Sequence, residues 1–345
     1  MVRIRRSDPS APGITRRGRG RGFEYQDPNG RRVADPETLE RIRSLAVPPA
    51  WRSVWISPDP RGHLQAVGTD AAGRRQYLYH PTWRERRDTE KFDRMVGFAR
   101  TLPSLRRKVR RDLRLEGMPR ERVLACAVRL LDRACFRIGT EEYTEQNGSY
   151  GLATLQRSHV RVRNGTAEFD YPGKGGSRQV LAVRDRAVAE VIRRLTRRRT
   201  GGPGLLAFQE HRRWTGVRSA DINGYIKEHA GDGYSAKDFR TWHGTVLAAV
   251  ALAAQPTPAS RTARVRAIAG SMREVAEYLG NTAAVARTSY VDPRVLDRYR
   301  SGWTIAAPLQ RLADGPGGLV MRRGIEEAVL DLLEDGPSDT IERAA

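Results

Sequence analysis

The sequence has no long hydrophobic run and only two cysteines. No apolar stretch approaches the roughly 18 residues that a membrane-spanning helix needs, so we expect no membrane contact. The N-terminus is rich in arginine and lacks the apolar segment of a secretory signal, which favours a cytoplasmic protein. Cys126 and Cys135 lie among apolar residues without CxxC or histidine spacing. They are typical of small core side chains in a reducing compartment, and we expect no metal site.

Lysine is also scarce. Only five of the 62 basic residues are lysines, although the chain has a formal net charge of +22. So strong a positive field favours a polyanionic partner such as nucleic acid, and the alternative is a general arginine bias. A lysine can donate a proton at a tuned pKa, whereas an arginine stays charged. Each lysine is therefore a candidate for a position that needs proton transfer. The five are Lys91, Lys108, Lys174, Lys227 and Lys237.

The 345 residues, of which 39% are hydrophobic, are enough for two folded domains. Residues 1–21 carry seven arginines among Pro, Gly and Ser, which predicts a disordered basic arm. Residues 22–86 alternate short strand-like segments with turn signals and predict a small antiparallel β domain. Residues 87–345 predict a larger, mostly helical domain that carries a small β-hairpin sheet. The fold class predicted is therefore α+β, with a domain boundary near residues 85–90.

Apolar residues at helical spacing predict the helices of both parts. One of them runs from 122 to 138, with Gly139 as its C-cap, and it leaves Arg137 among apolar neighbours near its end. A half-buried arginine needs an anionic partner, so Arg137 is a candidate site residue. The other predicted helices span 37–45, 83–122, 181–199, 219–228, 246–254, 265–279 and 325–333.

A β-hairpin is predicted where residues 160–163 and 167–171 alternate around the Asn-Gly pair at 164–165. A second tight turn, at 172–176, places Lys174 between glycines at its tip, where the backbone can approach a ligand closely. The turn is not a phosphate-binding P-loop, because the motif's first glycine is missing and neither Ser nor Thr follows the lysine. This absence argues against nucleotide binding.

Tyr290 closes a distinctive segment further along the chain. A helix ends at Leu279, Gly280 stops it, and a short second helix delivers Tyr290 before Asp292 and Pro293. Most tyrosines are core or surface aromatics, and this one alone would not indicate chemistry. Its significance depends on the basic residues that precede it in the chain.

Five short motifs occur together and in order. They read QYLYHPTW at 76–83, FRIGTEEY at 136–143, GK at 173–174, KDFRTW at 237–242 and SY at 289–290. With this pattern, over roughly residues 25–300, the chain resembles the type IB DNA topoisomerases of poxviral and bacterial type. The resemblance implies an enzyme that acts on duplex DNA as a monomeric clamp, in the cytoplasm and associated with the nucleoid.

The resemblance assigns roles that suit the residue types. Tyr290 would be the nucleophile that forms a 3′-phosphotyrosyl link, and Lys174 would be the general acid for the 5′-oxygen. Arg137 and Arg240 would bind the non-bridging phosphate oxygens. Asn281 takes the position at which many members have histidine; it can donate a hydrogen bond but cannot carry charge. An alternative for Asn281 is a plain helix N-cap. The reaction would need neither ATP nor a metal or other cofactor.

Duplex DNA is the expected partner. The alternating side chains of Gln76, Tyr77 and Tyr79 suit contact with a DNA groove, and Tyr143 and Lys237 lie in the matching motifs. A tyrosine recombinase is the first alternative, although recombinases have histidine where this chain has Lys237. A non-enzymatic nucleoid protein is the second; it would explain the charge but not Tyr290 or Lys174. The acidic segment after residue 304 is expected to pack as a cap away from the phosphate-binding face.

Overall fold

The computed structural model describes residues 3–20, 22–255, 258, 260–313, 323–334 and 342–343. The chain divides into two compact units, Met1–Asp93 and Arg94–Ala345. The division falls inside helix α2 (Pro81–Asp112), slightly beyond the expected boundary. None of the described helices is long and apolar enough to cross a membrane.

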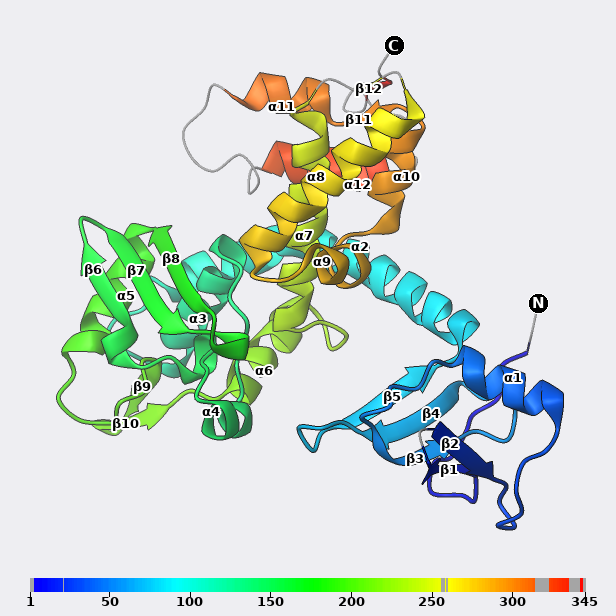
Figure 1. The fold of residues 1–345 in the computed structure, drawn as a ribbon. Helices are drawn as coiled ribbons and strands as arrows, with labels where there is room; N and C mark the ends of the chain where they lie inside the picture. The colour runs from blue at the N-terminus through cyan, green and yellow to red at the C-terminus, as the bar shows by residue number, and fades with distance from the viewer. Residues whose placement is uncertain are drawn as a thin grey trace. The chain divides into compact units, whose positions relative to one another are not determined.

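The N-terminal unit is built on a five-stranded antiparallel sheet and one helix (Figure 1). The strand order is β2-β1-β3-β4-β5, so the chain's first strand lies inside the sheet and not at its edge. The elements are β1 (Ile14–Arg19), β2 (Gly22–Gln26), α1 (Pro36–Ser44), β3 (Arg52–Ile56), β4 (Leu64–Thr69) and β5 (Arg75–Tyr79).

The prediction of a disordered arm over 1–21 was wrong. β1 pairs with β2 along its length and with β3 at Ile14, which is 4% exposed. The arginines do not prevent this, because side chains alternate across a strand and long cationic ones can lie on its open face. Arg16 shows how they are accommodated: its guanidinium donates to the carbonyls of Val47, Pro48 and Trp51.

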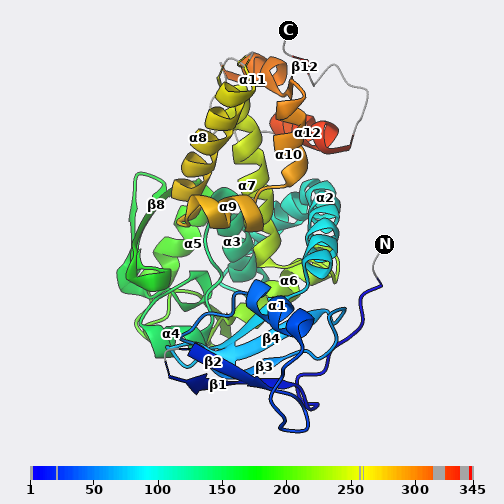
Figure 2. The same ribbon diagram turned by 45° about the vertical axis from the view of Figure 1, so that its right-hand side comes forward.

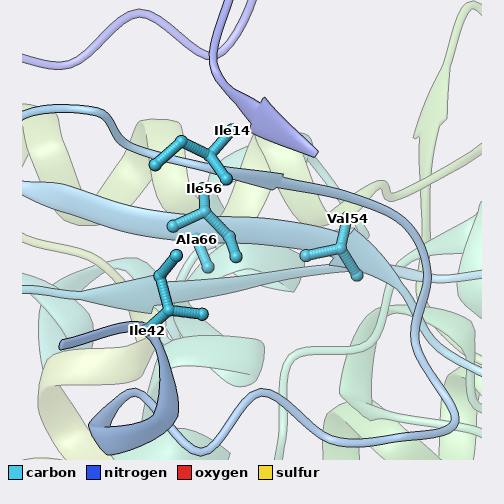
Figure 3. Packing of buried hydrophobic residues seen from close by; sticks show 5 residues of the cluster. All are labelled: Ile14, Ile42, Val54, Ile56 and Ala66. Atoms are coloured by element: carbon cyan, nitrogen blue, oxygen red, sulfur yellow. The ribbon is translucent and has the colours of Figure 1, made fainter. Parts of the chain in front are cut away.

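The core of this unit lies between the sheet and α1. Ile42 of α1 packs with Ile14, Val54, Ile56 and Ala66 from three strands (Figure 3). Each buried isoleucine or valine of this cluster stabilises the fold by roughly 1.5–3 kcal/mol. The α1 helix begins at the Asp35 N-cap, whose carboxylate accepts from the Thr38 N–H. The predicted small β domain is therefore present, and it is larger at its N-terminal end than expected.

The second unit is mainly helical, which confirms the predicted α+β class. Most of its helices come from segments with helical apolar spacing, as predicted. They are α3 (Arg120–Arg133), α4 (Glu141–Asn147), α5 (Arg186–Arg197), α6 (Ser219–Ala230), α7 (Ala236–Ala253), α8 (Arg261–Leu279), α9 (Ala283–Ser289), α10 (Pro293–Arg300), α11 (Ala306–Ala313) and α12 (Arg323–Glu334). Two-residue strands β11 (Trp303–Thr304) and β12 (Glu342–Arg343) pair with each other, as do β9 (Ala207–Glu210) and β10 (Arg213–Gly216).

A three-stranded antiparallel sheet carries the predicted hairpin. It consists of β6 (Val160–Arg163), β7 (Thr166–Pro172) and β8 (Arg178–Arg184), in that order. Asn164 and Gly165 have φ of 47° and 76°, the left-handed geometry that a two-residue hairpin turn requires. The helix predicted over 181–199 therefore begins later than expected, because residues up to 184 complete this sheet and Asp185 caps α5.

The helix predicted over 122–138 ends early, at Arg133. Gly139 does not cap it. Gly139 has a φ of 73°, and a Cβ there would lie 2.7 Å from the Cα of Gly151, so glycine permits two backbone segments to cross. The extended segment between Arg133 and Gly139 carries Arg137 away from the helix and toward α8.

Helix α7 forms the centre of the second unit. It contacts α3, α6, α8, α10, α11 and α12, and both ribbon views show α8 alongside it (Figures 1 and 2). Most of its residues are buried, including Trp242 and Phe239. The sequence predicted an apolar helix only from 246, but the helix begins ten residues earlier, at Ala236. The polar residues of that first part belong to the site described next.

Candidate active site

Arg240 places a buried guanidinium between α7 and two neighbouring segments. The residue is only 4% exposed. Its Nη1 donates to the carbonyl of Cys135, and its Nη2 donates to the carbonyl of Leu279 at 2.7 Å. Its Nε is buried and has no hydrogen-bond partner among the described residues. A buried cation that keeps one donor unpaired is suited to bind an incoming anion.

Arg137 reaches the same end of α8. Its Nη2 donates to the carbonyl of Gly280 and to Oδ1 of Asn281, both at 2.7 Å. Burial lowers the pKa of Arg137, and the positive charge of Arg240 lowers it further. Two guanidiniums thus converge on three consecutive residues, Leu279 to Asn281. Two like charges held together in this way produce a strong local potential for an anion.

Gly280 makes this convergence sterically possible. It ends α8 in the left-handed conformation, with a φ of 60°. A Cβ at this position would lie 3.2 Å from Oε1 of Gln179 and 3.6 Å from Nη1 of Arg137. Glycine therefore serves both the backbone geometry of the helix end and the close approach of β8.

Tyr290 ends the short helix α9. Its N–H donates to the carbonyl of Ala286 at 3.0 Å, and its ring centroid lies 5.1 Å from Cζ of Arg240. Helix α7 also holds its backbone: the Thr245 hydroxyl lies 3.3 Å from the Tyr290 carbonyl, and a Cβ on Gly244 would come within 2.7 Å of that oxygen. The same helix thus positions both Arg240 and the tyrosine.

Lys174 lies at the exposed tip of the β7–β8 turn. Gly175 and Gly176 both adopt positive φ there, and the N–H of Gly173 donates to the Ser177 carbonyl at 2.8 Å. Among the described residues Lys174 forms no ion pair, and no contact joins it to the arginines or to Tyr290. The link between this turn and the rest of the site is indirect. Gln179 provides this link, because its side chain packs closely against both Gly173 and Gly280.

Comparison with known proteins identifies the family to which the chain belongs. Residues 80–305 match a family model described as the catalytic core of eukaryotic DNA topoisomerase I, and residues 22–70 match the N-terminal domain of bacterial DNA topoisomerase IB. A DNA topoisomerase 1B of Acanthamoeba polyphaga mimivirus is 30% identical over 297 residues, which cover 84% of this chain and 88% of that protein. The chain belongs to the type IB DNA topoisomerase family.

Membership of the family makes the chain an isomerase that acts on DNA, as predicted. The match to the bacterial N-terminal domain also favours the topoisomerase reading over a tyrosine recombinase. In the described part of the chain, no group of three or more His, Cys, Asp or Glu side chains is arranged to hold a metal ion.

The expected DNA-contacting residues of the N-terminal unit lie on β5. Tyr77 and Tyr79 are 43% and 41% exposed, and their rings stack with centroids 6.3 Å apart. Gln76, on the other face of the strand, donates to Oδ2 of Asp70 at 2.8 Å. The two tyrosines therefore form an exposed aromatic pair suited to stacking or groove contact, whereas the glutamine is held in an internal hydrogen bond.

The remaining expected DNA contacts lie in the second unit. Tyr143, on α4, is half-buried and close enough to Arg137 to affect its pKa electrostatically. Lys237 is exposed on the first turn of α7, three residues before Arg240. Both positions are compatible with contact to DNA near the two guanidiniums.

Sequence reasoning did not identify three residues that shape the site: Gln179, Gly244 and Thr245. It also left open whether Asn281 is a helix N-cap, and the structure excludes that alternative. Thr282 caps α9, because its side chain accepts from the N–H of Val285 at 3.3 Å. The Asn281 side chain is thereby left to bind Arg137.

Proposed function

We propose that this topoisomerase cuts one strand of duplex DNA with Tyr290 and relaxes supercoils by rotation of the free end. The observation that carries the proposal is the position of the Tyr290 ring against Arg240, on a backbone held by α7. Arg137 binds the adjoining end of α8, so both cations lie next to the segment that leads to the tyrosine. A nucleophile flanked by two fixed cations suits attack on a phosphodiester.

In the proposed reaction, the phenolic oxygen of Tyr290 attacks phosphorus and the bond to the 5′-oxygen breaks. Arg137 and Arg240 stabilise the charge on the non-bridging oxygens of the transition state. Lys174, at the tip of a turn with two glycines, protonates the leaving 5′-oxygen. The tyrosine now carries a 3′-phosphate ester and the other end is a free 5′-hydroxyl. Attack by this hydroxyl restores the phosphodiester and the phenol.

Asn281 supports the transition state through its amide group. Its Oδ1 accepts from Arg137, while its Nδ2 makes, within the part of the chain that the structure describes, only a long contact of 3.4 Å with the Leu279 carbonyl. The Nδ2 donor is therefore nearly unoccupied and can turn to a phosphate oxygen. Asparagine supplies a neutral hydrogen bond where many members of the family would supply a histidine.

We further propose that the enzyme works without ATP or a metal ion. The phosphotyrosyl ester conserves the energy of the broken phosphodiester, and protein cations provide the charge stabilisation that a metal would otherwise give. The protein acts as a monomer that closes around the duplex and is associated with the nucleoid. The basic character of both units and the exposed aromatic pair on β5 support this part of the proposal.

Substitution of Tyr290 by Phe tests the proposal. The change removes one oxygen, so folding and DNA affinity should be unchanged while covalent capture and plasmid relaxation disappear. Capture is read on a denaturing gel with labelled duplex, and relaxation is measured with EDTA present and ATP absent. Tyr171 and Tyr299 cannot replace the nucleophile, because they are 4% and 1% exposed. A residual adduct in Tyr290→Phe would assign the nucleophile to another residue.

A further inference from the structure

A hollow lined by arginine side chains lies in the second unit, apart from the site just described. Its volume is about 390 Å³, and its walls come from α2, α3 and the first residue of α12. None of Arg137, Lys174, Arg240, Asn281 or Tyr290 contributes to it. The lining residues are Pro103, Arg106, Arg107, Arg110, Arg129, Asp132, Arg133 and Arg323.

The floor of this arginine pocket is a buried ion-pair network. Arg106 binds Asp132 at 2.7 Å and Glu326 of α12 at 2.5 Å. Arg129 binds Asp185 at 2.8 Å, and the same carboxylate lies 4.0 Å from Arg133. These contacts hold the guanidinium groups in place before any ligand binds, which reduces the entropy lost on binding.

The rim of the pocket carries unpaired positive charge. In the described part of the chain, Arg107 and Arg110 form no hydrogen bond or ion pair, and both are exposed. Arg323 pairs on the surface with Glu327, at 2.6 Å. Among the described residues, the six lining arginines face four carboxylates, those of Asp132, Asp185, Glu326 and Glu327, so two positive charges remain uncompensated there.

Burial and like charge both act on the arginines of the pocket. Loss of surrounding water lowers the pKa of Arg133, and the neighbouring Arg129 lowers it further. An anion that entered the pocket would relieve this repulsion. Arginine forks bind two oxygens of one phosphate group at once, so the chemistry of the lining favours phosphate over a simple halide.

The size of the pocket selects among phosphate-bearing anions. A hollow of about 390 Å³ is much larger than one phosphate ion needs, and a second hollow of about 420 Å³ shares Arg107 and Arg110 with it. Arg111 of α2 and Arg114, just after the end of that helix, line the second hollow. The arginines of α2 alone, from Arg106 to Arg111, span more than one turn, about 7.5 Å, which fits a short chain of linked phosphates.

We propose that the arginine pocket binds an oligophosphate anion, of the length of tripolyphosphate or of the phosphate chain of a nucleoside triphosphate. The pocket also has a route to the catalytic helix. Glu326, which binds Arg106 on the pocket floor, accepts a hydrogen bond from Nε1 of Trp242, two residues after Arg240. A ligand in the pocket therefore binds next to the network that packs against α7.

Calorimetric titration of the full chain with sodium tripolyphosphate, in about 150 mM salt and without DNA, tests the proposal. We expect one saturable site per chain. The double variant Arg107→Ala/Arg110→Ala should bind at least about tenfold more weakly, because it loses two charge-assisted contacts. Both residues are exposed and unpaired, so the melting temperature without ligand should be unchanged. Binding without saturation, or equally tight binding by the double variant, would overturn the proposal.

A matched control variant distinguishes specific binding in the arginine pocket from non-specific binding to the positive surface. Arg197→Ala/Arg199→Ala also removes two exposed arginines, at the end of α5, and should bind tripolyphosphate as the wild type does. Equal weakening in both variants would mean that the anion binds the positive surface in general, which contradicts the proposal. A short duplex should not displace tripolyphosphate at one equivalent; full displacement would assign the pocket to the DNA-binding surface instead.

Discussion

In the proposed reaction, the amide of Asn281 serves both to hold Arg137 and to bind the phosphate. Its Oδ1 fixes Arg137 at 2.7 Å, and its Nδ2 is nearly free. We predict that Asn281→Ala slows single-turnover cleavage by about tenfold or more, since a hydrogen bond to a charged group contributes roughly 1.5–3 kcal/mol. Asn281→His should keep the wild-type rate or raise it modestly, because imidazole can accept from Arg137 and donate to phosphate.

The cap of α9 provides the control for this pair of variants. Because Thr282 and not Asn281 caps the helix, neither substitution removes a helix cap. Asn281→His keeps an acceptor for Arg137 and should leave the melting temperature nearly unchanged, whereas Asn281→Ala loses that hydrogen bond and should lower the melting temperature slightly. A normal cleavage rate in Asn281→Ala would show that the amide has no role in the transition state.

Gly244 has no catalytic atom, yet the structure predicts that its replacement disables the site. Alanine is usually the better helix residue, by about 1 kcal/mol. Here the added Cβ would lie 2.7 Å from the Tyr290 carbonyl oxygen and 3.0 Å from the Tyr290 Cβ, closer than packed atoms tolerate. Gly244→Ala should therefore displace the tyrosine and reduce the cleavage rate by about tenfold or more, because catalysis is sensitive to shifts of about 1 Å.

Gly224 offers the matched control. It is also a glycine inside a helix, α6, but a Cβ there would meet no atom within 4 Å. Gly224→Ala should leave cleavage unchanged and the protein as stable as the wild type or slightly more so. If Gly244→Ala cleaves DNA at the wild-type rate, the close packing of α7 against Tyr290 is not needed for the reaction.

The sequence could name the residues proposed to react but not the residues that position them. Tyr290, Arg137 and Arg240 follow from a resemblance in motif order, and the structure brings these three together. Gly244 and Gln179 have no comparable signal, because their importance lies in a distance to a residue far away in the chain. The catalytic roles of all four residues stay predictions, and Lys174 differs in that its exposed turn makes no contact with the other three in the described structure.

At the level of elements, local sequence patterns predicted the helices and strands whose ends do not depend on contacts with distant segments. The hairpin at 160–171 followed from its Asn-Gly turn, and α8 and α12 from their apolar spacing. The failures have tertiary causes. β1 forms because β2 and β3 supply partners for its backbone, and the segment after Arg133 leaves its helix because Arg137 binds α8. Long-range pairing of this kind outweighs local propensity.

Helix α12, in the acidic C-terminal segment, is an integral part of the second unit. Arg106 of α2 lies between Asp132 of α3 and Glu326 of α12, and Trp242 of α7 also donates to Glu326 at 3.2 Å. We predict that Glu326→Ala lowers the free energy of unfolding by about 3–5 kcal/mol, because it leaves a buried guanidinium short of a partner. Chemical denaturation measures the loss.

Glu334 lies on α12, like Glu326, but it forms a surface ion pair with Arg100 of α2. This pair serves as the comparison. Its distance is 2.6 Å, but the two side chains are 64% and 30% exposed. Glu334→Ala should therefore cost less than about 1 kcal/mol. Similar losses in the two variants would show that the buried network contributes no more than an ordinary surface pair.

At the scale of the whole molecule, the arginines serve two different purposes, internal ion pairs and positive charge on the surface. Fifty-seven of the 62 basic residues are arginines, and several of these are used internally, as in the pairs of Arg106, Arg122 and Arg129 with carboxylates. The whole chain, internal pairs included, has a formal net charge of +22. Composition alone could not separate these two uses of arginine, because burial is decided by packing. The separation matters for DNA binding, to which only exposed cations contribute counterion release.

We predict that the affinity for duplex DNA falls steeply with salt. Each neutralised phosphate contributes a slope of about −0.9 to a plot of log affinity against log salt concentration. The measurement should use Tyr290→Phe, so that covalent capture does not distort the equilibrium, with fluorescence anisotropy at several salt concentrations. An affinity independent of salt would mean that the positive charge serves solubility and not DNA binding.

Two lysines make this prediction specific to a position. Lys237 and Lys227 are both exposed in the second unit, but only Lys237 lies one helical turn from Arg240, where a DNA phosphate would be bound. In the Tyr290→Phe background, Lys237→Ala should reduce the salt slope by about 0.9, since one phosphate contact is lost. Lys227→Ala removes the same charge and should leave the slope unchanged. If both variants have the same salt slope, Lys237 does not contact a DNA phosphate, and its substitution acts only through the net charge.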